Sequence, residues 1–218
     1  AANIALLNLN EWEKFSHKLN DSFSNGKSLN DFEKEFSNNL KGKKLLEKWK
    51  NLYSEITEKF KVEDPKKRVK WVGPDMSVIS SISARHMETW AHGQAIFDSL
   101  GIKRKNEDRI LNIVIIGNNT FNWSYKVNKL DIPKQIPYLK LTSPSGELWE
   151  FNDKQNTNYI AGMAEEFCQV VTQVRNIKDV KLTVRGAIAE EWMSLAQCFA
   201  GKAQTPPKPA TRRIHLSK

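Results

Sequence analysis

One stretch with uninterrupted helical spacing, residues 77–100, constrains the fold of this chain most strongly. The turn sequence Gly73-Pro74-Asp75-Met76-Ser77 precedes it, and Asp75 or Ser77 can act as the N-cap because short polar side chains accept hydrogen bonds from the first free amides of a helix. Gly101 follows it, and glycine suits the left-handed position of a helix C-cap. The sequence therefore predicts one long helix near the middle of the chain.

One face of this helix carries Arg85, Glu88 and His92, since each residue advances about 100° around a helix. A glutamate and a histidine four positions apart have Cβ atoms about 6 Å from each other. Both can converge on one divalent ion, as helix-borne carboxylate and imidazole ligands do in bundle metal sites. The alternative interpretation is an ordinary surface charge pair, in which Arg85 also pairs with Glu88.

A catalytic zinc ion usually has three protein ligands and one open position, so a Glu-x-x-x-His pair needs at least one further ligand. The remaining histidines are poor candidates. His17 occupies a solvent-facing helical position, His86 points away from the Glu88–His92 face, and His215 lies close to the last residue. The residues of this chain alone therefore predict an incomplete ligand set.

Other residues of the long helix have both structural and functional interpretations. Gly93 indicates close approach of another group, because a glycine inside a helix costs about 1 kcal/mol relative to alanine. We expect Trp90 and the nearby Trp71 to be core residues and not ligand-stacking ones. Asp98 is either a partner of a metal ligand or a surface carboxylate near the helix end.

The rest of the chain predicts an α+β protein with a helical first part. Helical spacing covers 3–20, 29–40 and 45–60, and we favour a helix at 106–121, although 113–116 alone also suits a buried strand. Beyond Trp123 we predict a hairpin of 138–142 with 147–151, strands at 158–161 and 180–184, and helices at 163–174 and 187–199. The predicted domains are therefore 1–124 and 132–200, followed by a proline-containing, disordered tail at 201–218.

Composition excludes several classes of protein. The formal net charge is +9, but only eight of the 34 basic residues are arginine and no nucleic-acid motif accompanies them, so a nucleic-acid partner is not favoured. No apolar run approaches the roughly 20 residues that span a bilayer, and the first seven residues lack the basic start and long apolar centre of a signal peptide, so we expect a cytoplasmic protein without membrane contact. Cys168 and Cys198 lie far apart in apolar surroundings, which predicts buried, reduced thiols.

Several motifs are more specific than the ligand spacing. They include 71–77, Ala84-Arg85-His-Met-Glu88-Thr-Trp-Ala-His92-Gly-Gln94, 98–101, 141–149, 167–173 and 196–201. Together they closely resemble a bacterial family related to mycothiol-dependent maleylpyruvate isomerase, within the DinB superfamily. The resemblance covers 71–201 well and the earlier helices by general pattern.

This resemblance implies a four-helix metal-binding bundle whose ion is held by one early histidine and a later Glu-x-x-x-His. Glu88 and His92 match the later pair. The early histidine normally lies in a motif like His-Leu-x-x-Phe-Asp, which this chain lacks, so the first helix and third ligand are expected upstream of Ala1. Residue 1 is not methionine, in keeping with that expectation. A second departure is Ala95, where such relatives often carry aspartate.

The resemblance also implies an activity: a metal- and thiol-dependent isomerase or transferase acting on a small electrophilic molecule. The metal would be zinc or a similar ion, the thiol a small one such as mycothiol, and Arg85 would orient Glu88 or meet an anionic group. Two alternatives remain. One is a metal-binding protein without catalysis, and the other is an RNA-associated module, because the C-terminal half of such relatives has been likened to a wyosine-formation domain.

Overall fold

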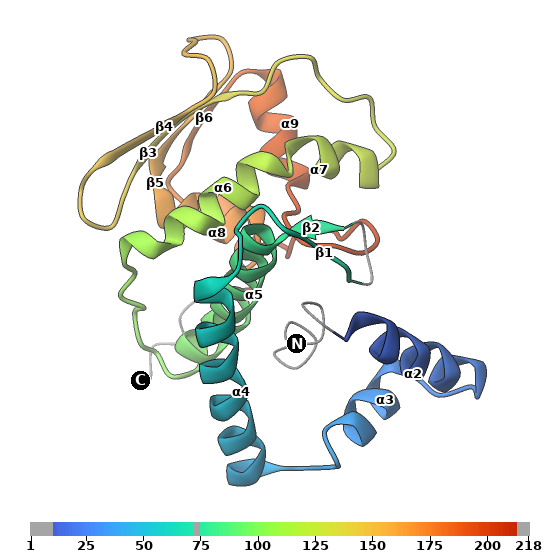
Figure 1. Ribbon diagram of the computed structural model, residues 1–218. Helices are drawn as coiled ribbons and strands as arrows, with labels where there is room; N and C mark the ends of the chain where they lie inside the picture. Colours follow the sequence, from blue (N-terminus) through green and yellow to red (C-terminus); the bar gives the residue numbers. More distant parts are fainter. Residues whose placement is uncertain (1–10, 72–74, 213–218) are drawn as a thin grey trace. The chain divides into compact units, whose positions relative to one another are not determined.

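The computed structural model describes residues 11–71 and 75–212, which divide into a compact unit up to Arg85 and a second one from His86 onward. Its described part confirms the expected α+β class, with a helical N-terminal region followed by a small sheet (Figure 1). The division between compact units falls earlier in the chain than the predicted boundary between 124 and 132. The domain assignment itself stays a prediction.

The first unit contains a helical hairpin, α2 (Trp12–Ser24) and α3 (Leu29–Phe36). Its small core consists of Phe15, Leu19 and Phe32, with the rings of Phe15 and Phe32 5.8 Å apart. Ser28 caps α3, since its hydroxyl accepts a hydrogen bond from the amide of Asp31. Helices expected at 3–20 and 29–40 are confirmed here, apart from residues 3–10, which lie outside the described residues.

The helix α4 (Gly42–Val62) confirms the helix expected at 45–60. Ile56 is its buried residue and packs with Ile82 at the start of the next helix. Two short strands, β1 (Arg68–Val69) and β2 (Met76–Ser77), pair in antiparallel fashion before that helix.

The long predicted helix is α5 (Val78–Ser99), and both of its predicted ends are confirmed. Ser77 caps it, because its Oγ accepts a hydrogen bond from the amide of Ser80 at 3.2 Å. At the other end Gly101 has φ +68°, and the amide of Ile102 donates to the carbonyl of Phe97 at 3.0 Å, which is a Schellman cap. Neither α5 nor any other described helix combines the length and apolar character needed to cross a membrane.

The second unit is built on a four-stranded sheet with the order β4-β3-β5-β6. Its strands are β3 (Tyr138–Thr142), β4 (Leu148–Phe151), β5 (Tyr159–Met163) and β6 (Thr183–Arg185). The predicted hairpin is β3 with β4, and all the pairings are antiparallel except β3 with β5. Leu139 and Leu141 are fully buried while Lys140 between them is exposed, so one face of the sheet is covered by the core.

Four helices contribute most of the rest of that core (Figure 1): α6 (Leu111–Asn119), α7 (Phe121–Val127), α8 (Ala164–Val171) and α9 (Ala187–Leu195). Met87 and Trp90 of α5 also belong to it. Trp192 of α9 lies at its centre, with its ring 5.0 Å from that of Phe121 and 5.8 Å from that of Phe167. The favoured helix at 106–121 is confirmed in α6. Because α6 and α7 bury their apolar faces here, they belong to the same compact unit as the sheet.

Residues 201–212, which we call the strap, differ from the disordered tail that their composition predicts. Gln197, which is fully buried, holds the strap through its side chain: it donates to the carbonyl of Lys202 and accepts from the amide of Gln204. Further along, Asn176 donates to the carbonyl of Pro207. Side-chain hydrogen bonds from the body therefore replace regular secondary structure. Residues 213–218, with His215, lie outside the described residues.

Candidate functional site

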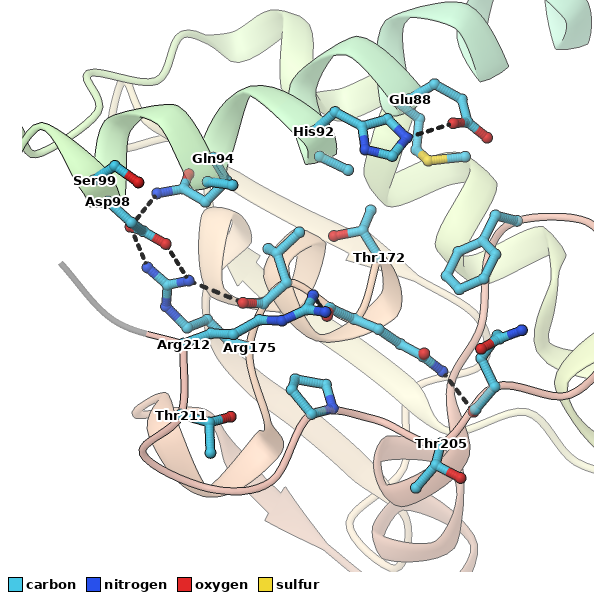
Figure 2. Close-up of a pocket in the computed structure, with 18 residues that line it drawn as sticks. Glu88, His92, Gln94, Asp98, Ser99, Thr172, Arg175, Thr205, Thr211 and Arg212 are labelled. Atoms are coloured by element: carbon cyan, nitrogen blue, oxygen red, sulfur yellow. Dashed lines mark hydrogen bonds and ion pairs between the residues drawn. The ribbon is translucent and has the colours of Figure 1, made fainter. Parts of the chain in front are cut away.

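A pocket of about 630 Å³ lies within the second unit (Figure 2). Three segments and Phe199 surround it: residues 87–99 of α5, residues 172–175 directly after α8, and the strap. Glu88 and His92 line it from α5. The segment on which the sequence placed its candidate chemistry therefore forms one wall of a cavity.

Glu88 and His92 contact each other, with 3.3 Å between His92 Nε2 and Glu88 Oε2. The side chain of His92 is 85% exposed and that of Glu88 37%, so both donor atoms can be reached from solvent. The expected shared helix face is therefore present. The same contact would form in a plain surface ion pair, and what distinguishes this pair is its place in the pocket wall.

These two side chains fit a divalent ion as two of its ligands, because carboxylate oxygen and imidazole nitrogen are donors that such ions use. Among residues 11–71 and 75–212, no group of three or more histidine, cysteine, aspartate or glutamate side chains is placed to hold an ion. His17 is exposed on α2. His86 is partly buried, and burial lowers its pKa, with further lowering by the charges of Arg109 and Arg104.

Arg85 lies on α5 and is partly buried, and its role stays a prediction. Trp90 is confirmed as a core residue: it is 2% exposed, and its Nε1 donates to Asn106 Oδ1 at 2.8 Å. The guanidinium of Arg104 lies 5.0 Å from the centre of the Trp90 ring system. A Cβ on Gly93 would lie 3.6 Å from Arg104 Nη1, which is an ordinary van der Waals contact. This distance leaves room for a Cβ, so the close approach predicted at Gly93 is not confirmed.

Asp98 is buried, so the interpretation as a surface carboxylate is wrong. Its two oxygens accept hydrogen bonds from Arg175, at 2.6 Å from Nη2 and 2.8 Å from Nη1. Gln94 Nε2 also donates to Asp98, at 3.1 Å. All three residues line the pocket. Sequence reasoning missed Arg175, because nothing local to residue 175 indicates a partner on α5.

Gln173 shapes the pocket from the end of α8. Its φ is +56°, in the left-handed region, and the amide of Val174 donates to the carbonyl of Gln169, so α8 ends in a Schellman cap without glycine. The Gln173 amide group donates to the carbonyls of Ala196 and Gln204, at 3.1 Å each. This residue therefore ties the strap to the pocket, and no sequence signal pointed to it.

Both cysteines are free and buried, as predicted. Burial raises the pKa of the Cys168 and Cys198 thiols well above the ordinary value, and the charge of Glu88 adds to the effect at Cys198. Neither thiol forms a thiolate at neutral pH, so both are chemically inert in the folded protein.

Comparison with known proteins shows a likeness over the first part of the chain. Residues 8–97 match the model of the mycothiol maleylpyruvate isomerase N-terminal domain. This part of the chain is similar to that domain. The match confirms the predicted resemblance, and it includes Glu88 and His92. Asp98, residues 172–175 and the strap lie beyond the matched residues, so they complete the pocket with parts that the family model does not match.

Two uncharacterized proteins of Mycobacterium tuberculosis are similar to the chain: MT0041 of strain CDC 1551 / Oshkosh and Rv0036c of strain H37Rv. Each is 34% identical over 157 residues, which cover 72% of this chain and 61% of the relative. The chain thus spans about three fifths of the length of the curated relatives it matches. No solved structure matches it significantly.

Proposed function

We propose that this protein binds a divalent metal ion, zinc or a similar one, through Glu88 and His92, and that it acts as a thiol-dependent isomerase or transferase on a small electrophilic molecule. One observation carries the proposal: the Glu88–His92 pair, with its atoms 3.3 Å apart, lies in the wall of a pocket of about 630 Å³. The match of residues 8–97 to the mycothiol maleylpyruvate isomerase N-terminal domain supports the same chemistry.

A bound divalent ion lowers the pKa of a thiol, so that thiolate forms at neutral pH. The residues of the chain would hold the metal ion and position the reacting molecules. Glu88 and His92 supply two ligand atoms, and the apolar side chains of Met87, Ala91 and Phe199 line the pocket beside them. In the reaction, the thiolate sulfur would add to one carbon of a conjugated double bond, which breaks the π bond and moves its electron pair to the neighbouring carbonyl group. Isomerisation would follow by rotation about the resulting single bond and loss of the thiolate, which re-forms the double bond.

The attacking thiol in this proposal belongs to a separate small molecule. The chain has two cysteines, and both are buried with a raised pKa. Because a protonated, inaccessible thiol is a poor nucleophile, neither Cys168 nor Cys198 can take the role of the added thiol.

Metal content tests the first part of the proposal. The purified protein should contain about one zinc or similar ion per chain, measured by elemental analysis after dialysis. His92→Ala should reduce the content to background, and Glu88→Gln should weaken retention. His17→Ala is the matched control, because His17 is exposed on α2, outside the pocket lining. Undiminished metal in the His92→Ala protein would contradict the proposed site.

Thiol dependence tests the second part. Turnover of maleylpyruvate-like electrophiles should fall to background when no small thiol is added, and Cys198→Ala should leave the thiol-supported rate unchanged. Turnover that persists without an added thiol would contradict the proposed mechanism.

A further inference from the structure

We propose that Arg212 is the anion-recognition residue of the pocket, and that the ligand it receives is a small carboxylate with an apolar body. The contact between Arg212 and a carboxylate does not depend on a metal ion.

The position of Arg212 is set by the strap and the end of α8 (Figure 2). Its Nη1 donates to the backbone carbonyl of Gln173 at 2.9 Å, and the residue lines the pocket. A guanidinium has five N–H donors, and this contact uses one of them. Among the described residues, Arg212 has no carboxylate partner, and the residue is exposed, so a ligand in the pocket can reach its charge.

Arg175, the other arginine of the pocket, differs in this respect. Two of its nitrogens are bound to Asp98 at 2.6 and 2.8 Å, and its side chain is 9% exposed. Its charge is therefore already compensated. Of the two guanidinium groups, only that of Arg212 can add a positive charge to the pocket.

The other residues that line the pocket restrict the polarity and charge of the ligand. Val174, Phe199 and Pro207 give the pocket apolar surface near the strap, while Glu88 supplies negative charge from α5. A ligand with one carboxylate and an apolar body satisfies both the cation and the apolar surface. A planar carboxylate also matches the fork geometry of a guanidinium.

Two probes of nearly equal shape test the proposal: cinnamate and cinnamamide, which differ in charge. Their dissociation constants are measured by titration calorimetry in the presence of a chelator, so that metal binding does not enter. Wild-type protein should bind cinnamate about tenfold more tightly than cinnamamide, as expected for one charge-assisted contact. Arg212→Gln should remove this preference and leave the affinity for cinnamamide unchanged. Lys208→Gln, which removes one charge from the strap outside the pocket lining, should keep the preference.

Several outcomes would overturn the proposal. These are no binding or equal binding of both probes to the wild type, a preference that survives in Arg212→Gln, or equal losses in Arg212→Gln and Lys208→Gln. Equal weakening of both probes by Arg212→Gln would indicate that Arg212 only holds the strap. Tighter binding of phenyl phosphate than of cinnamate would refute the assignment to a carboxylate. A failure of zinc binding in the separate metal experiment would leave this result unaffected.

Discussion

Asp98 on α5 and Arg175, four residues after the end of α8, form a bidentate ion pair. The N···O distances are 2.6 and 2.8 Å, and both side chains are about one tenth exposed. The two residues are 77 positions apart in the chain. The helix α5 also carries Glu88 and His92. The Asp98–Arg175 ion pair therefore fixes the α5 wall of the pocket to residues 172–175. Removing one partner of a buried ion pair destabilises a protein strongly, because the other charge is then left buried without compensation.

Asp98→Asn should lower the free energy of unfolding by about 3–5 kcal/mol, because it leaves the charge of Arg175 buried without compensation. Chemical denaturation followed by tryptophan fluorescence measures the change. The double variant Asp98→Leu/Arg175→Met should be clearly more stable than the single one, as both charges are removed together. A double variant as unstable as Asp98→Asn would show that the uncompensated charge is not the cause.

The same glycine-to-alanine substitution should have opposite effects in two helices. Gly117 of α6 packs against α8, where an added Cβ would lie 2.8 Å from Val171 Cγ2 and 2.9 Å from Phe167 Cε1, so Gly117→Ala should cost about 1–3 kcal/mol. At Gly93 the nearest atom would be at 3.6 Å, an ordinary contact. Gly93→Ala should therefore stabilise the protein by up to about 1 kcal/mol. Thermal unfolding of both variants checks the signs, and equal signs would refute this account.

Gln173→Ala should release the strap, because it removes the donors to the carbonyls of Ala196 and Gln204. Hydrogen exchange of residues 201–212, measured by mass spectrometry, should become faster. Gln173→Gly should do the same while relieving the left-handed strain, which is worth about 1 kcal/mol. Gln204→Ala is the control, since Gln204 is held through its backbone. Equal acceleration in this control would contradict the assigned role of Gln173.

His86 should make stability depend on pH. Burial, together with the charges of Arg109 and Arg104, lowers its pKa below the ordinary 6.5. As the pH falls, the unfolded chain therefore takes up a proton at His86 at a higher pH than the folded chain does. Its contribution is therefore complete above pH 6.5 and is lost as the pH falls below that value. Denaturation midpoints between pH 7.5 and about 5 should fall less steeply in His86→Gln. His17→Gln, exposed on α2, is the control, and an unchanged slope in His86→Gln would contradict the prediction.

Local patterns in the sequence were sufficient to predict the structural elements that depend only on neighbouring residues. The caps of α5 at Ser77 and Gly101 and the shared face of Glu88 and His92 follow from helical geometry, which repeats within a few residues. The hairpin of β3 and β4 follows for the same reason, because alternation and a Ser-Gly turn are visible over a dozen residues.

Tertiary structure decided what surrounds that helix face. The strap has the composition of a disordered segment, yet it is ordered by Gln173 and Gln197, whose amide groups pair with its backbone. Composition records the prolines of a segment but not the donors that another segment offers to it. The partner of Asp98 and the place of Arg212 in the pocket were hidden for the same reason, since each depends on contacts between residues far apart in the chain.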